Sequence, residues 1–310
     1  MANTSQQKPA DYITPLYING MQGRMLHIPA PAGKKREILF VYGHHASLER
    51  YWGIMEDMND YGAVTMPDLP GFGGMDSFYK VGKEPTLDNF ADYLASFIKL
   101  RYRRKHLTII GFSLGFVIAT RMLQRYPDLA KKVDLLISAV GFTHHDDFSF
   151  TPRRHGMYLL AARIFKRHWP AVFFQNVCLN PTILRLAYSR TNNAREKFAG
   201  LTRAEHRDIM NFEIHLWHSN DVRTYMATAA AFLTLDNCQK RVNLPVWHIE
   251  VDADRYLDSH RVEQHMRVVF EDFHSVKSKM NNHAPSIILS KAEARPFTPA
   301  KIRALLSERV

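Results

Sequence analysis

Short apolar runs and longer amphipathic segments alternate along the first half of the chain. Runs such as Glu37–Tyr42 and His106–Ile110 are bounded by polar or Gly- and Pro-containing segments, which is typical of buried parallel strands. Between them, Leu87–Leu100 and Leu114–Arg125 carry apolar residues at helical spacing. A further helix is expected over 48–59, and further strands over 62–66 and 133–140. This alternation predicts an α/β fold with a mainly parallel sheet flanked by helices.

The pattern changes after Gly141. From Thr143 to Lys240 the chain has long helical segments without convincing strand alternation, and Tyr158–Phe174 is rich in apolar and aromatic residues. Strand patterns resume at 244–251 and 273–279, and a closing helix is expected over 299–308. We therefore predict a core domain formed by residues 1–142 and 241–310, with a helical cap inserted at residues 143–240.

Chain length, cysteine content and hydropathy narrow the class of protein. The 310 residues suffice for one large domain, or for a core with a smaller domain. Cys178 and Cys238 form neither a disulfide framework nor a zinc-ligand spacing, which favours a reducing compartment. Met1–Asp11 has no apolar core of signal-peptide length, and no apolar stretch is long enough to cross a membrane. A soluble, cytoplasmic protein is expected.

The charge balance bears on the partners. The chain has 41 Lys and Arg against 30 Asp and Glu, a formal charge of +11. Such an excess favours acidic partners, but no RNP, zinc-finger or helix-turn-helix pattern accompanies it, so nucleic-acid binding is not expected. Within 143–240, 13 Lys and Arg face 8 Asp and Glu. The hypothesis that follows is contact between a basic cap and an anionic membrane surface.

The five residues Gly111-Phe112-Ser113-Leu114-Gly115 match a Gly-x-Ser-x-Gly pattern. Chance produces this pattern fairly often, but here it lies between a predicted strand and a predicted helix, the setting of a nucleophile elbow. Glycines flank such a serine because the strained turn approaches neighbouring backbone closely. The pattern therefore indicates that Ser113 is a nucleophile.

At this point the sequence resembles the α/β-hydrolase family, and the resemblance extends over nearly the whole chain. The segment Tyr42–Ser47 looks like the family's oxyanion loop, and Asp68–Asp76 resembles its Asp-x-x-Gly-x-Gly-x-Ser loop. The resemblance implies a serine hydrolase with a helical cap. It implies no cofactor.

A serine hydroxyl needs an adjacent base, and the family's chain order is Ser, then acid, then His. Of the 16 histidines, His283 follows the last predicted strand in a polar loop, where the family's base falls. Histidines of the insertion, such as His215 and His218, are expected to be solvated or locally hydrogen-bonded. His283 is therefore the predicted base.

The acid is chosen among several carboxylates. Aligned on the family's Gly-x-x-Asp-x-x-Val pattern, Asp254 takes the acid position, although Val251 stands where Gly is usual. Its role would be to hold the imidazole tautomer and stabilise the imidazolium. The competitors are Asp252 and Asp258 after the same strand, and Asp146 and Asp147 one strand earlier.

By the same resemblance, the backbone amides of Leu114 and His44 form the oxyanion hole. The family usually opens this loop with His-Gly, whereas Tyr42-Gly43 stands here, which leaves His45 as an alternative donor. Adjacent histidine side chains usually diverge, and no further ligands follow at a known spacing, so no metal is expected there.

The cap should cover the triad and define the substrate pocket. We predict that His45, Phe112, Trp169 and Phe173 contact the substrate, although packing within the cap is an equally ordinary role for its aromatic residues. An apolar acyl or alcohol group is the expected ligand.

Ester hydrolysis through an acyl-enzyme on Ser113 is the leading functional hypothesis. Haloalkane dehalogenases and epoxide hydrolases resemble the chain but carry Asp at the elbow, which argues against both. Acyl transfer, carbon–carbon bond hydrolysis, hydroxynitrile lysis and cofactor-free haloperoxidation stay open. So does a non-catalytic ligand-binding module.

Overall fold

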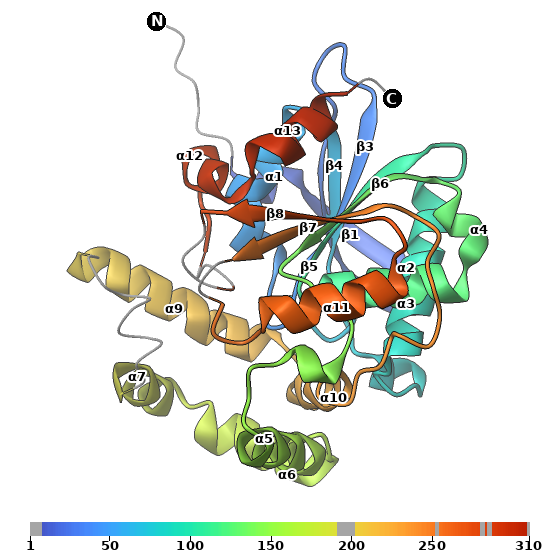
Figure 1. Ribbon diagram of the computed structural model, residues 1–310. Helices are drawn as coiled ribbons and strands as arrows, with labels where there is room; N and C mark the ends of the chain where they lie inside the picture. Colours follow the sequence, from blue (N-terminus) through green and yellow to red (C-terminus); the bar gives the residue numbers. More distant parts are fainter. Residues whose placement is uncertain (1–7, 191–201, 252–253, 280–282, 284–286, 309–310) are drawn as a thin grey trace, which may run out of the picture.

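An eight-stranded sheet forms the centre of the molecule in the computed structural model (Figure 1), which describes residues 8–190, 202–251, 254–279, 283 and 287–308. The strand order is β1-β2-β4-β3-β5-β6-β7-β8, and all neighbours from β4 to β8 are parallel. The strands are β1 Ile13–Ile18, β2 Met21–Ile28, β3 Arg36–Val41, β4 Gly62–Pro67, β5 Leu107–Phe112, β6 Val133–Ala139, β7 Val246–Val251 and β8 Phe273–Ser278. The predicted α/β class with a mainly parallel sheet is confirmed.

Helices cover both faces of the sheet (Figure 1). One face carries α1 (Trp52–Asn59), α12 (Lys291–Ala294) and α13 (Ala300–Ser307). The other carries α2 (Leu87–Arg101), α3 (Leu114–Arg125) and α11 (Ser259–Val269), with the short α4 (Pro127–Ala130) after α3. Four 3-10 turns complete the core: η1 Pro9–Tyr12, η2 Leu48–Tyr51, η3 Phe78–Val81 and η6 Arg295–Phe297.

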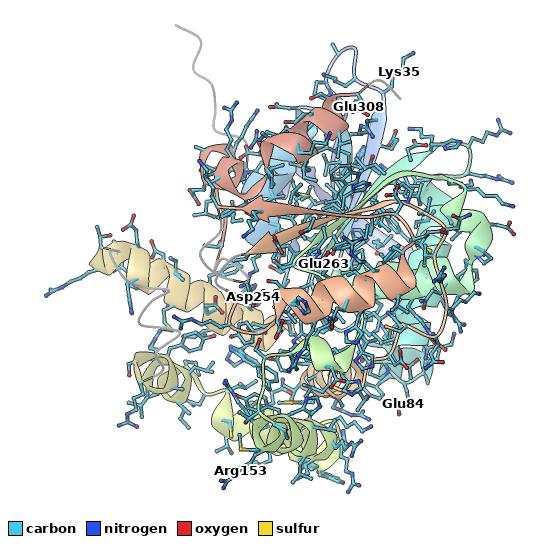
Figure 2. The ribbon with its side chains drawn as sticks, in the orientation of Figure 1. Lys35, Glu84, Arg153, Asp254, Glu263 and Glu308 are labelled. Carbon is cyan, nitrogen blue, oxygen red and sulfur yellow. The ribbon has the colours of Figure 1, made fainter. Side chains whose placement is uncertain are left out.

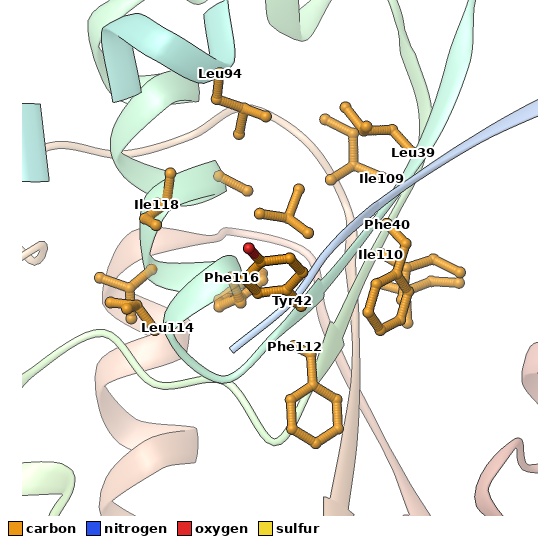
Figure 3. Close-up of a cluster of buried hydrophobic side chains, with 14 of the residues drawn as sticks. Leu39, Phe40, Tyr42, Leu94, Ile109, Ile110, Phe112, Leu114, Phe116 and Ile118 are labelled. Atoms are coloured by element: carbon orange, nitrogen blue, oxygen red, sulfur yellow. The ribbon is translucent and has the colours of Figure 1, made fainter. Parts of the chain in front are cut away.

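The main hydrophobic core lies between the sheet and these helices. Figure 3 shows part of it, where side chains of β3 and β5 meet those of α2 and α3. All six residues of β5 are buried, as expected for a strand covered on both faces. Ser113 follows β5 directly, so this packing fixes where the serine stands.

The segment between β6 and β7 is helical. Its elements are η4 His145–Asp147, α5 Pro152–Phe165, α6 His168–Phe173, η5 Phe174–Cys178, α7 Pro181–Arg190, α9 Arg203–Ser219 and α10 Val222–Phe232. In Figure 1, α5, α6 and α7 lie away from the sheet. The cap is tied to the core where Asn220 Oδ1 accepts from Gly73 N–H at 2.9 Å and Gly71 O accepts from Asp221 N–H at 2.8 Å.

The hairpin formed by β1 and β2 was not predicted. Strand β2 is antiparallel to both β1 and β4, and β1 exposes much of its surface at the edge of the sheet. An edge strand of this kind lacks the continuous apolar run that identifies a buried strand. Among the described residues, no helix combines the length and apolar character needed to cross a membrane.

Candidate active site

Ser113 occupies a strained turn between β5 and α3. Its backbone has φ 49° and ψ −116°, a positive φ that non-glycine residues rarely adopt. A Cβ at Gly115 would lie 2.0 Å from the carbonyl oxygen of Val41, and one at Gly111 would lie 2.5 Å from Cα of Phe116. Both positions therefore require glycine. The same close contacts hold Ser113 at the carboxyl edge of the sheet.

A chain of hydrogen bonds joins three of the predicted residues. Ser113 Oγ lies 3.0 Å from His283 Nε2, and His283 Nδ1 lies 2.6 Å from Asp254 Oδ2. The three side chains come from the loops after β5, β7 and β8, which end at the same edge of the sheet. This is the order serine, base, acid that nucleophilic catalysis uses.

Asp254 is held by its backbone surroundings. Its Oδ1 accepts from Tyr256 N–H at 2.8 Å and Leu257 N–H at 3.2 Å, which leaves Oδ2 for His283. Burial raises the pKa of Asp254, but the hydrogen bond and charge of His283 and the two amides outweigh it, so the pKa lies below its ordinary value. The carboxylate stays ionised. Figure 2 shows Asp254 near the junction of core and cap.

The competing carboxylates have other contacts. Asp258 Oδ1 accepts from His260 N–H and Arg261 N–H and so caps α11. Asp147 is buried and bonds His265, whereas Asp146 is exposed. Asp252 lies outside the described residues.

His44 connects the predicted oxyanion loop to the cap. Its Nε2 lies 3.1 Å from the carbonyl oxygen of Tyr225 and 3.0 Å from Thr228 Oγ1, both on α10. Burial lowers the pKa of His44 to about 4, against the opposing effect of the Tyr225 hydrogen bond. The ring is neutral at pH 7 and donates to the carbonyl. Its side chain is therefore structural, and the oxyanion role predicted for His44 rests on its backbone amide.

Leu114 is the first residue of α3, where a backbone N–H has no intrahelical acceptor. It directly follows Ser113, so its amide belongs to the same turn. His45 has φ 56°, and Arg50 Nη1 donates to its carbonyl oxygen at 2.7 Å. The His45 ring lies 4.2 Å from that of Trp217 in the cap.

A cavity of about 580 Å³ opens onto Ser113 and His283 and is bounded by core and cap. His44, His45, Phe112 and Leu114 line it, as do many cap aromatics. The aromatic lining comprises Tyr51, Phe142, Phe148, Phe150, Tyr158, Tyr188, Trp217, Tyr225, Phe232 and Tyr256 in addition to Phe112. Such a lining suits an apolar ligand with few polar anchors.

Trp169 and Phe173 lie outside this cavity, contrary to the expectation from the sequence. Their exposed fractions are 77% and 57%, and neither side chain is among the lining residues. The reason is helix geometry. Ala171 is the buried residue of α6, and residues two positions away lie about 200° around a helix, on its opposite side.

Glu213 is a pocket residue that the sequence reasoning missed. It is only 1% exposed, and its Oε2 accepts from the hydroxyl of Tyr188 at 3.1 Å and lies 3.9 Å from His45 Nε2. It lies three residues after Met210 and three before Leu216, both buried. The sequence carried one sign of this position, since Glu213 is a carboxylate on the apolar face of a helix. It gives one wall of the aromatic cavity a polar group.

Asp68, in the loop after β4, forms buried contacts on the core side of the cavity. Its side chain is fully buried and lies 3.0 Å from Arg24 Nε, while Tyr42 Oη donates to it at 3.1 Å. Burial raises the pKa of Asp68 to about 8, although Arg24 opposes this. The same Tyr42 hydroxyl accepts from Leu69 N–H, so this loop and the oxyanion loop share one buried network.

A family model described as "Serine aminopeptidase, S33" matches residues 32–278. The chain belongs to this family. The match spans the sheet from β3 to β8 together with the cap, and the fold is that of the α/β hydrolases. No curated protein matches the sequence significantly.

Solved structures share the fold at low identity. The enol-lactonase from Burkholderia xenovorans LB400 is 12% identical with a TM-score of 0.66, over 95% of this chain and 100% of that one. An esterase from Exiguobacterium antarcticum is 14% identical with a TM-score of 0.62, over 86% and 90%. An epoxide hydrolase from Bacillus megaterium is 14% identical with a TM-score of 0.63, over 94% and 98%. These similarities show the fold, and the chain is a member of a hydrolase family.

Proposed function

We propose that this protein is a serine hydrolase that cleaves carboxylic esters through an acyl-enzyme on Ser113. The observation that carries the proposal is the chain of hydrogen bonds from Ser113 through His283 to Asp254, placed at the floor of an aromatic cavity. A serine with a paired base and an orienting carboxylate is the constellation of acyl transfer.

In the first step, His283 Nε2 takes the proton of Ser113 as Oγ attacks the ester carbonyl carbon. The imidazolium that forms is stabilised by the ionised Asp254 at 2.6 Å. Backbone amides of Leu114 and His44 are proposed to bind the developing oxyanion, because donors fixed before the reaction cost no reorganisation. The carbon–oxygen bond to the alcohol then breaks, and His283 protonates the leaving alcohol.

In the second step, His283 takes a proton from water, which attacks the acyl carbon. The bond to Ser113 Oγ breaks, the serine recovers its proton from His283, and the carboxylic acid leaves. Every proton passes through His283, so no cofactor takes part in the proposed route.

The lining of the cavity supports an ester with an apolar acyl or alcohol group. Aromatic side chains from both core and cap form most of its wall, and its volume of about 580 Å³ falls in the range of small-molecule sites.

The test is turnover of p-nitrophenyl esters of graded acyl length by the native chain and by Ser113→Ala. The expected result is loss of turnover with an unchanged circular dichroism spectrum. Ser138→Ala is the matched control, because Ser138 Oγ lies 2.9 Å from His248 Nδ1, yet both are buried and neither lines the cavity. This variant should keep its activity.

A fluorophosphonate probe separates catalysis from ligand binding. It should label the native chain and Ser138→Ala and fail to label Ser113→Ala. Undiminished turnover by Ser113→Ala would refute the nucleophile assignment, and an unlabelled native chain would favour a binding module.

Contact of the cap with an anionic membrane surface is a second proposal. Among the described residues of the cap, eight large apolar side chains are strongly exposed, including Met157, Leu160, Trp169 and Phe173. Exposed basic residues lie on the same helices, including Arg153, which points away from the core in Figure 2. Proteins bind anionic membranes when apolar side chains enter the membrane–water interface and nearby cations attract the anionic lipid headgroups.

Co-sedimentation with neutral and anionic phospholipid vesicles tests this proposal. The native chain should prefer anionic vesicles, and a Trp169→Ala/Phe173→Ala variant should lose most of the bound fraction. Leu100→Ala is the control, since Leu100 is 71% exposed but lies on α2 of the core. Equal binding to both vesicles would remove the proposal.

A further inference from the structure

Three consecutive residues converge at the root of the cap. His144, His145 and Asp146 follow β6 at the point where the chain leaves the core, and one ligand atom from each lies within 4.8 Å of the others. Adjacent side chains usually diverge, but the 3-10 turn η4 brings these together, with the two imidazole centroids 4.2 Å apart. None of the three lines the cavity above Ser113.

The hydrogen bonds of the two imidazoles set their tautomers. His145 Nδ1 lies 2.9 Å from the carbonyl oxygen of Leu235, so Nδ1 carries the proton and the lone pair is on Nε2. His144 Nδ1 lies 3.1 Å from Asp146 N–H, which is a donor, so this nitrogen holds the lone pair. Metal-ligating histidines characteristically donate their other N–H to a carbonyl or carboxylate, as His145 does.

Both of these nitrogens lie close to the carboxylate of Asp146. His144 Nδ1 lies 3.6 Å from Asp146 Oδ2, and His145 Nε2 lies 3.6 Å from Asp146 Oδ1. Two ligands about 2.0–2.1 Å from a tetrahedral zinc ion are separated by about 3.4 Å. The two nitrogen–oxygen distances of 3.6 Å are close to this ligand–ligand separation. A metal would take the lone pair of His144 that Asp146 N–H now faces.

The surrounding structure holds the turn in place. Asp147 is fully buried and its Oδ2 accepts from Thr143 N–H at 2.9 Å and His144 N–H at 3.0 Å. The backbone of His144 also forms an isolated β-bridge with that of Asp236, in the segment that returns from the cap. Both connections between core and cap therefore meet at this turn.

We propose that His144, His145 and Asp146 bind one divalent transition metal ion, with Zn²⁺ as the representative ion. Two imidazole nitrogens and a carboxylate oxygen are the donors such ions take, and the remaining position is left to water. Because His145 is also bonded to Leu235, the bound ion ties the outgoing and returning connections of the cap together. The site lies apart from Ser113, His283 and Asp254 and takes no part in ester cleavage.

The experiment is calorimetric titration of ZnCl₂ into the full-length chain without a histidine tag, in a buffer that does not bind metal. One zinc ion per chain is expected at this site. Asp146→Asn should weaken its binding by at least about tenfold, and His145→Ala should abolish it. The Asp146 side chain is 64% exposed, so Asp146→Asn is expected to fold normally, which circular dichroism checks.

Two matched variants make the result decisive. Asp272→Asn removes the carboxylate of another exposed His–Asp pair, in which His274 Nε2 lies 2.7 Å from Asp272 Oδ1, and should bind zinc like the native chain. His283→Ala should also keep this zinc ion, because it alters only the candidate active site. At the same zinc concentration, zinc should raise the melting temperature of the native chain more than that of Asp146→Asn. Equal zinc affinity in the native chain, Asp146→Asn and His145→Ala, or no binding at millimolar zinc, would overturn the proposal.

Discussion

The core and the cap are packed in different ways. All six residues of β5 and ten of the twelve in α3 are buried, whereas α5 has one buried residue in fourteen, Ala162. Among the described residues, eight of the thirteen strongly exposed large apolar side chains belong to the cap. The core is therefore the more densely packed region and positions Ser113, while the cap contributes much of the cavity wall and an apolar outer surface.

The two regions meet at the oxyanion loop. His44 enters the cap to bond α10, and the ring of His45 packs against Trp217 of α9. The cap thus contacts the loop proposed to bind the oxyanion as well as forming part of the cavity wall. Four sets of substitutions test this difference between core and cap.

The largest effect is expected at the acid in the core. Asp254→Asn should lower kcat by about 10⁴-fold, since the imidazole loses the partner that sets its tautomer. Steady-state turnover of a p-nitrophenyl ester measures this. Asp258→Asn is the control: asparagine caps a helix about as well as aspartate, so this variant should change stability little and leave kcat unchanged. The acid is misassigned if the two variants behave the other way round.

Truncation of one buried apolar side chain in each region compares the packing of the core with that of the cap. Phe90→Ala, in the fully buried face of α2, should lower the free energy of unfolding by about 3–5 kcal/mol. Leu184→Ala, in the small cluster of the cap, should fall at the low end of the range for leucine, about 2 kcal/mol, because the loosely packed neighbours can collapse. Urea denaturation followed by circular dichroism gives both values. Equal losses would contradict the contrast in packing.

Acid should destabilise the protein through His44 and His248. Burial lowers the pKa of each to about 4, below the ordinary value near 6.5 that holds in the unfolded chain. The unfolded state therefore binds more protons between these values. The stability each neutral ring contributes is complete above pH 6.5 and is lost as the pH falls toward 4. The loss amounts to roughly 3 kcal/mol per residue.

The measurement is the free energy of unfolding at a series of pH values for His44→Gln and His248→Gln. Between about pH 4 and pH 6.5, each variant should reduce the slope of the unfolding free energy against pH by the equivalent of about one bound proton. Only His44→Gln should also raise KM, because of these two histidines only His44 bonds α10 and lines the cavity. If KM rose in both variants, the rise in His44→Gln could not be attributed to its lost contact with α10.

The smallest effect is expected on the outer face of the cap. Trp169→Ala and Phe173→Ala should each change the free energy of unfolding by less than about 0.5 kcal/mol. Their KM for a short-chain ester in solution should be unchanged, because neither lines the cavity. Trp217→Ala, which removes one of the aromatic side chains that line the cavity, should raise KM and serves as the positive control. A rise in KM for Trp169→Ala would place that residue in the substrate path.

Local sequence patterns determined much of the core. The strands β3 to β8 and the helix α3 follow from apolar runs and helical spacing, because a parallel sheet buried on both faces leaves a continuous apolar signal. Ser113 could be assigned because the nucleophile motif joins a strand to a helix within five residues. His283 and Asp254 were accessible through family resemblance and their positions after particular strands.

Long-range packing sets which side chains line the cavity and which side of each cap helix is buried. The orientation of Trp169 and Phe173 depends on which side of α6 faces the neighbouring helices, and a six-residue helix without a clear apolar stripe does not specify it. Glu213, Tyr188 and His45 come together from distant parts of the chain, so no local pattern relates them. The convergence of His144, His145 and Asp146 likewise depends on the turn that Asp147 holds. Local patterns record which face of an element is apolar. Which partner that face meets is decided by long-range packing.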